Sequence, residues 1–234
     1  MSKVVDNLLW IKERIEKAAV KAGRGPSEVL LVAVSKTIGV EKIEEAISAG
    51  ATVFGENYVQ EAKEKIEKIG HQIRWHMIGH LQTNKAKKAV NLFDMIQSVD
   101  SIDLAKEINK RAGQLDKRIS VLIEVNVSGE ATKSGAERET AVSLVSEVGG
   151  LTNIKVEGLM TMPPYFSNPQ EARPYFKLLR ELGEHIERQR FASVSMKELS
   201  MGMSGDFEIA IEEGATMVRV GTAIFGDRAY GRRP

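Results

Sequence analysis

A lysine at the end of an apolar run is the first candidate for chemistry. The run Leu30–Val34 leads through Ser35 into Lys36, and its continuous apolar character is typical of a strand buried on both faces of a parallel sheet. Such sheets carry their chemistry at the carboxyl ends of the strands, where Lys36 would lie. Because desolvation lowers the pKa of an amine, a lysine there can form a Schiff base with an aldehyde. In the plainer interpretation Lys36 ends the strand and extends into water.

Two glycine-containing stretches could bind an anion. Residues 202–205 lead into a helix predicted to begin near residue 207, and Gly221 and Thr222 follow an apolar strand. The free amides and the dipole of a helix N-terminus attract negative charge, and barrels of alternating strands and helices often bind phosphate after strands seven and eight. We therefore expect a phosphate site there that includes Ser204. The alternative is an ordinary helix start, capped by Ser204 or Asp206.

Arg219 interrupts the otherwise apolar stretch 217–220. A guanidinium inside a barrel needs a partner, because burying an unpaired charge is very costly. A structural partner would be a carboxylate, either Glu124 or Glu157. A functional partner would be a ring nitrogen or a phosphate of a bound ligand. The sequence leaves both interpretations open.

The other lysines and the histidines are weaker candidates for chemistry. Lys85 and Lys133 lie in predicted loops on the same face and rival Lys36 for an aldehyde, but only Lys36 directly ends a fully apolar strand. Most remaining lysines fall on predicted helix surfaces, where solvation is the simpler interpretation. His71, His80 and His185 show no metal-ligand spacing, and the chain has no cysteine, so we predict no metal site.

Strands and helices that could position these residues alternate along the whole chain. Apolar runs predict eight strands, at residues 30–34, 51–55, 73–79, 93–99, 120–127, 154–162, 194–201 and 216–225. Helical periodicity predicts helices at residues 4–21, 40–49, 58–69, 85–92, 102–112, 136–148, 169–190 and 207–213. Eight such units indicate a (β/α)8 TIM barrel with an extra N-terminal helix, rather than an open doubly wound sheet. We expect one domain spanning residues 1–234.

Composition narrows the function classes. The 234 residues are 42% hydrophobic and 28% charged, as in an ordinary globular protein, and the net charge is +1. This balance gives no electrostatic reason to expect a nucleic-acid or membrane partner. The first residues lack the pattern of a signal peptide, no apolar run reaches membrane-spanning length, and disulfides are excluded. We expect a cytoplasmic protein.

Several blocks of sequence, in order, resemble one family. The blocks are AVSK (33–36), FGENYVQE (54–61), WHMIGHLQTNK (75–85), KSG (133–135), GLMTM (158–162), LSMGMS (199–204) and VRVGTAIFG (218–226). Together they resemble the pyridoxal 5'-phosphate (PLP) homeostasis proteins, the YggS/PROSC family.

The resemblance implies a fold similar to the N-terminal barrel of alanine racemase and a PLP site within it. By this likeness PLP would be held as a Schiff base on Lys36, Asn57 would lie beside the ring, and Arg219 would face the pyridine nitrogen. The phosphate would be held by Ser204, Gly221 and Thr222. No catalytic residue is implied.

The function that this resemblance implies is intracellular PLP homeostasis, by sequestration and delivery to PLP-dependent apoenzymes, without a dedicated reaction. A cationic arginine at the pyridine nitrogen keeps the nitrogen unprotonated and weakens carbanion chemistry. Racemases of similar barrel type tolerate this arginine, but they also use an acid–base residue from a second domain, which we expect to be absent here. The alternative is a racemase-type enzyme of low activity, and a third hypothesis is a barrel that binds another phosphorylated metabolite. We expect a monomer.

Overall fold

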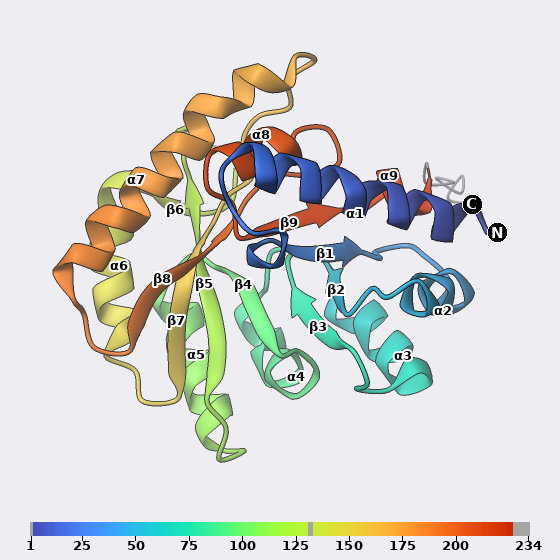
Figure 1. Cartoon of the computed structure of the whole chain (residues 1–234). Coiled ribbons are helices and arrows are strands. Elements are labelled where there is room, and N and C mark those ends of the chain that lie inside the picture. The colour runs from blue at the N-terminus through green and yellow to red at the C-terminus, as the bar shows by residue number, and fades with distance from the viewer. Residues whose placement is uncertain (1, 131–132, 227–234) are drawn as a thin grey trace.

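Eight parallel strands form a closed barrel in the computed structural model, which describes residues 2–130 and 133–226. Neighbouring strands pair in chain order around the barrel, and pairing of β9 with β1 closes it (Figure 1). The strands are β1 Leu30–Val34, β2 Val53–Glu56, β3 Arg74–Met77, β4 Met95–Val99, β5 Ile119–Asn126, β7 Ile154–Met160, β8 Val194–Ser200 and β9 Met217–Val220. The predicted (β/α)8 barrel is confirmed.

Helices surround the barrel and an additional helix precedes it. Those between strands are α2 Val40–Ser48, α3 Val59–Ile69, α4 Ala86–Leu92, α5 Ile102–Gly113, α6 Arg138–Gly149, α7 Arg173–Gln189 and α8 Phe207–Glu212. The short helix α9, Thr222–Phe225, follows the last strand, and 3-10 turns lie at Pro26–Glu28, Thr83–Lys85 and Pro169–Ala172. The predicted extra helix is α1, Lys3–Lys21, which packs along α8 and α9 (Figure 1). In the part of the chain that the structure describes, no helix is long and apolar enough to cross a membrane.

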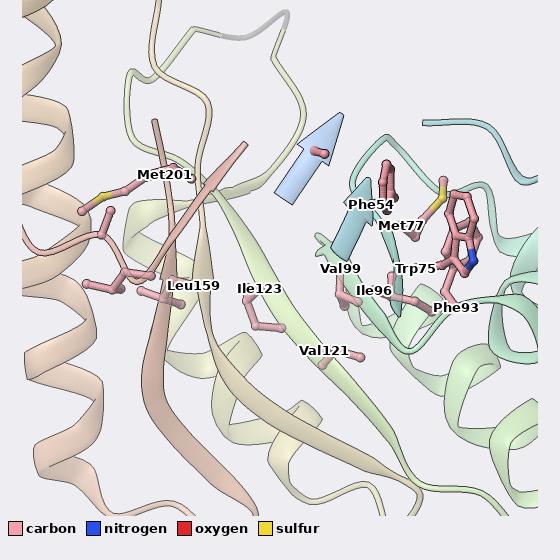
Figure 2. Packing of buried hydrophobic residues seen from close by; sticks show 14 of the residues in the cluster. Phe54, Trp75, Met77, Phe93, Ile96, Val99, Val121, Ile123, Leu159 and Met201 are labelled. Atoms are coloured by element: carbon pink, nitrogen blue, oxygen red, sulfur yellow. The ribbon is translucent and has the colours of Figure 1, made fainter. Parts of the chain in front are cut away.

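Most strands bury both of their faces along much of their length, which explains their largely apolar sequences. β8 is the exception, because only Leu199 and Ser200 at its carboxyl end are buried. One face packs against the helices, where Phe54 and Trp75 lie with ring centroids 5.7 Å apart, close to Phe93 and Met77 (Figure 2). The other face fills the barrel. A separate apolar cluster occupies the interior: Val32, Val53, Met95, Leu122, Met160 and Met217.

Polar side chains form a further part of the interior. Side chains alternate along a strand, so residues two positions beyond an interior residue also point inward. Gln97 follows Met95 in this way, Glu124 follows Leu122, and Arg219 follows Met217; all three polar residues are buried. The barrel interior is therefore apolar near the amino ends of these strands and polar near their carboxyl ends.

Several predicted boundaries were wrong, including those of the eighth strand and of the helix predicted from residue 136. The eighth strand was predicted at 216–225, but β9 ends at Val220 and residues 222–225 form the short helix α9. Gly221 separates them, and its φ of −120° and ψ of −76° fit neither element. The helix predicted from residue 136 begins at Arg138, because Ala136–Glu137 form a short strand, β6, beside β5.

Candidate functional site

A cavity of about 580 Å³ opens at the carboxyl ends of the strands. All six residues predicted to bind the cofactor line it: Lys36, Asn57, Ser204, Arg219, Gly221 and Thr222. They come from four different parts of the chain, after β1, after β2, before α8 and around the end of β9. Their convergence is the first structural support for the predicted site, while their roles in binding stay predictions.

Lys36 lies in a tight turn at the end of β1. The amide of Ile38 donates to the carbonyl oxygen of Ser35 at 3.0 Å, and Thr37 has a φ of +65°. Turns of this kind need a positive φ at their third residue, where glycine or asparagine is usual and a β-branched residue is rare. The conformation of the segment that carries Lys36 is therefore specific, and the surrounding side chains must hold it.

Asn57 is placed by the close approach of another loop. A Cβ atom on Gly79 would lie 2.7 Å from both Cα and the carbonyl oxygen of Asn57. Only glycine allows the backbone after β3 to come so near. Gly79 thus fixes the wall of the cavity that Asn57 forms.

The predicted anion site gathers backbone amides around one hydroxyl. The amides of Gly221 and Ala223 lie 3.3 and 3.4 Å from Oγ of Ser204, which accepts from them. The amide of Met203 instead donates to Oδ1 of Asp206 at 2.6 Å. Asp206 is the N-cap residue of α8 by position, but its side chain forms no capping hydrogen bond to the helix. Oγ of Ser204 lies at the end of β9 instead. The alternative of an ordinary helix start capped by Ser204 or Asp206 is therefore not supported.

Arg219 is buried and held by neutral groups. Its Nη1 donates to Oγ of Ser200 at 2.6 Å, and its Nη2 donates to the carbonyl oxygen of Thr161 at 2.7 Å. Ser200 in turn donates to Oε1 of Gln97 at 2.7 Å, and Nε2 of Gln97 lies 2.9 Å from Nδ1 of His76. This chain crosses the barrel from β9 to β3 and fixes the guanidinium against the cavity.

Neither carboxylate proposed as a structural partner forms an ion pair with Arg219. Glu157 binds Lys155 at 2.7 Å and accepts from Ser120. Glu124 is buried nearby and attracts Arg219 through space, but the described residues include no ion pair between the two. The interpretation of Arg219 as half of a structural salt bridge is therefore not supported.

Burial dominates the electrostatics of this interior. It lowers the pKa of Arg219 to about 10, with Glu124 and Asp206 partly offsetting the effect, so the guanidinium stays charged at neutral pH. Burial and then repulsion from Asp100 raise the pKa of Glu124 to about 7, against the attraction of Arg219. Burial also lowers the pKa of His76 to about 3, so its ring is neutral.

Sequence reasoning missed the residues that support the site. Ser200, Thr161 and Gln97 carry no local signal, because their meeting depends on the register of distant strands. Lys65 falls in the helix predicted at residues 58–69, where a solvated lysine is the simpler expectation, but it is 6% exposed and its Nζ donates to the carbonyl oxygen of Ser35. The sequence offers one clue to this pairing, which is Glu61 four residues before Lys65. The clue is weak, because the same spacing is common between charged residues on solvated helix surfaces.

The rival lysines lie elsewhere. Lys85 lines a neighbouring cavity of about 490 Å³, and Lys133 forms an ion pair with Glu130 at 3.0 Å. Among the lysines of the described ranges, the cavity lining contains Lys36 and neither rival. No cluster of three potential metal ligands occurs within residues 2–130 and 133–226.

Comparison with known proteins first defines the class. A family model described as "Alanine racemase, N-terminal domain" matches residues 7–229, so the chain belongs to that family of barrels. An alanine racemase from Clostridium difficile has the same fold, with a TM-score of 0.76 at 16% identity, over 96% of this chain and 60% of the racemase.

More similar relatives narrow the class to one family. A pyridoxal phosphate homeostasis protein from Aquifex aeolicus is 48% identical over 226 residues, covering 96% of this chain and 98% of the relative. One from Escherichia coli is 37% identical over the whole of both chains. PipY from Synechococcus elongatus, solved with PLP bound, has a TM-score of 0.80 at 36% identity, covering 92% of this chain and 100% of PipY. The chain belongs to the pyridoxal phosphate homeostasis family, as the sequence blocks predicted.

Proposed function

We propose that this protein binds PLP at the cavity beside Lys36 and serves in PLP homeostasis, holding the cofactor and delivering it to PLP-dependent apoenzymes. The observation that carries the proposal is the convergence of an amine, an anion site and a buried cation on one cavity. Family membership supports the proposal, because relatives that match over nearly their full length are named pyridoxal phosphate homeostasis proteins, and PipY has been solved with PLP bound.

The donor groups of the cavity fit PLP. Amides of Gly221 and Ala223 converge on the hydroxyl of Ser204. A phosphate bound at this point would accept from the two amides in place of the hydroxyl oxygen, and from the hydroxyl group itself. The segment that carries these amides follows β9 and Asn57 follows β2, and these two strands pair with opposite edges of β1. A cavity of about 580 Å³ leaves room for a small aromatic ring between them.

PLP supplies an electrophilic aldehyde and an electron-withdrawing pyridine ring. Lys36 would hold the aldehyde carbon covalently through Nζ, with loss of one water molecule. Asn57 would lie beside the ring. Arg219, fixed by Ser200 and Thr161, would face the ring nitrogen and disfavour a proton there.

The absorbance spectrum of the purified protein, before and after borohydride reduction, tests the cofactor and its anchor. A visible band that disappears on reduction, with a pyridoxyl group mapped to Lys36, is the expected result. Lys36→Ala should lose the band, and Lys85→Ala is the matched control that should keep it. A colourless protein that takes up no PLP, or label on Lys85 alone, would overturn the proposal.

Delivery is tested separately. PLP-loaded protein is mixed with a PLP-dependent apoenzyme in the presence of an aldehyde scavenger that removes free PLP. Activation of the apoenzyme under these conditions supports transfer. Solvent deuterium entering the α-carbon of amino acids at an enzymatic rate would instead favour the racemase-type alternative. A cytoplasmic location and a monomeric state stay predictions from the sequence, and sedimentation of the PLP-loaded protein tests the second.

A further inference from the structure

A buried network of charged side chains surrounds the turn that carries Lys36. Nζ of Lys65, on α3, donates to the carbonyl oxygen of Ser35 at 2.6 Å, to Glu56 at 2.7 Å and to Glu61 at 2.6 Å. Ser35 also donates through Oγ to the same oxygen of Glu56 at 2.6 Å. Four side chains from β1, β2 and α3 thus meet directly behind the turn.

Glu61 links this network to the residue after Lys36. Its Oε1 accepts from the backbone amide of Thr37 at 2.5 Å as well as from Lys65. Both chain neighbours of Lys36 are therefore bound, Ser35 through its carbonyl group and Thr37 through its amide. The positive φ of Thr37 is disfavoured for a β-branched residue, so the bond to Glu61 holds a conformation that the chain would not adopt by itself.

The network is more buried than an ordinary surface ion pair, with Glu56 and Lys65 at its buried end and Glu61 at its partly exposed end. The side chains of Lys65 and Glu61 are 7% and 25% exposed, whereas the neighbouring pair Lys63–Glu67 on the same helix is 47% and 61% exposed. Burial raises the pKa of Glu56, and Lys65 partly offsets this. Desolvated charges are retained in such a place only when their partners are well aligned.

We propose that Glu61 and Lys65 are positioning residues that fix the Lys36 turn, so that Nζ of Lys36 is directed at the aldehyde of PLP. The inference rests on the proposed function, because it assigns a role to Lys36 in binding that aldehyde. Neither residue is among those lining the cavity in the described chain, so their effect passes through the backbone of residues 35–37.

Binding of two ligands distinguishes a positioning role from a general loss of structure. PLP has the aldehyde, and pyridoxine 5'-phosphate has the same ring and phosphate without it. We expect Glu61→Ala to weaken PLP binding about tenfold, equivalent to about 1.4 kcal/mol, and to change pyridoxine 5'-phosphate binding less than about twofold. Glu61→Gln keeps an oxygen that accepts from Thr37 and should remain within about threefold of the parent protein.

Glu67→Ala is the matched control, since it removes an exposed ion pair of the same spacing from the same helix. It should bind both ligands as the parent does. Equal losses for both ligands in Glu61→Ala, or no loss for either, would overturn the positioning role. Failure of the parent protein to bind PLP, or a pyridoxyl group on another lysine after reduction, would overturn the proposed function instead.

Discussion

Glu124 should make the stability of this protein depend on pH near neutrality. The carboxyl is 2% exposed, and its pKa is about 7 in the folded protein against an ordinary value of 4.5. At about 1.4 kcal/mol per pH unit, this difference corresponds to about 3 kcal/mol. Because the folded pKa is the higher one, the contribution is fully present below 4.5 and is lost as pH rises through 7.

The variant Glu124→Gln isolates this effect, because the amide has a similar shape and does not titrate. We expect the free energy of unfolding of the variant, relative to the parent protein, to rise by about 2.5 kcal/mol between about pH 5 and about pH 8. Urea unfolding of both PLP-free proteins across this range measures the difference.

Glu157→Gln is the control, since Glu157 is part-exposed on the adjacent strand and paired with Lys155. Its relative stability should not follow the same pH course. A difference between Glu124→Gln and the parent that stays constant within about 0.5 kcal/mol across the range would refute the reasoning. That result would mean that Glu124 is ionised in the folded state, as a direct partner of Arg219 would be.

Three further substitutions test the close contacts of the site. Gly79→Ala would bring a Cβ within 2.7 Å of the backbone of Asn57, so we expect about 2 kcal/mol of destabilisation in urea unfolding and weaker PLP binding. Gly158→Ala would place a Cβ 1.8 Å from the carbonyl oxygen of Glu198, so it should disrupt the pairing of β7 with β8 and cost about 3 kcal/mol or more in the same assay. Ser204→Ala should weaken PLP binding about tenfold and leave binding of pyridoxal, which lacks the phosphate, unchanged in titration.

The positions of the strands follow from the sequence because most strands are buried on both faces along much of their length. A strand such as Leu30–Val34 must be apolar throughout, and the glycines and helical periods between strands mark where it can end. The predicted end of the eighth strand was wrong because the apolar sequence continues beyond β9. Ile224 and Phe225 are apolar and buried, but they belong to a helical turn after Gly221, and an apolar pair does not distinguish the two elements.

The cavity-lining residues were predicted in part because they stand at strand ends, where a barrel gathers them. Lys36 and Arg219 interrupt or end apolar runs, so each is conspicuous on its own. Lys65 is not, because an acidic residue four positions before a lysine usually marks a solvated helix face. Its burial depends on the packing of α3 against the carbonyl group of Ser35, which is a tertiary contact without a local pattern.

The surroundings of Arg219 bear on the choice between carrier and catalyst. Its direct partners are a hydroxyl and a carbonyl group, so no ion pair with a carboxylate neutralises it among the described residues. Its pKa of about 10 keeps it charged at neutral pH. A fixed cation at that place opposes protonation of a pyridine nitrogen, and an unprotonated ring withdraws electrons weakly. In the proposed orientation, with the pyridine nitrogen toward Arg219, the site would hold PLP better than it would stabilise a carbanion, and this agrees with delivery of the cofactor as the proposed role.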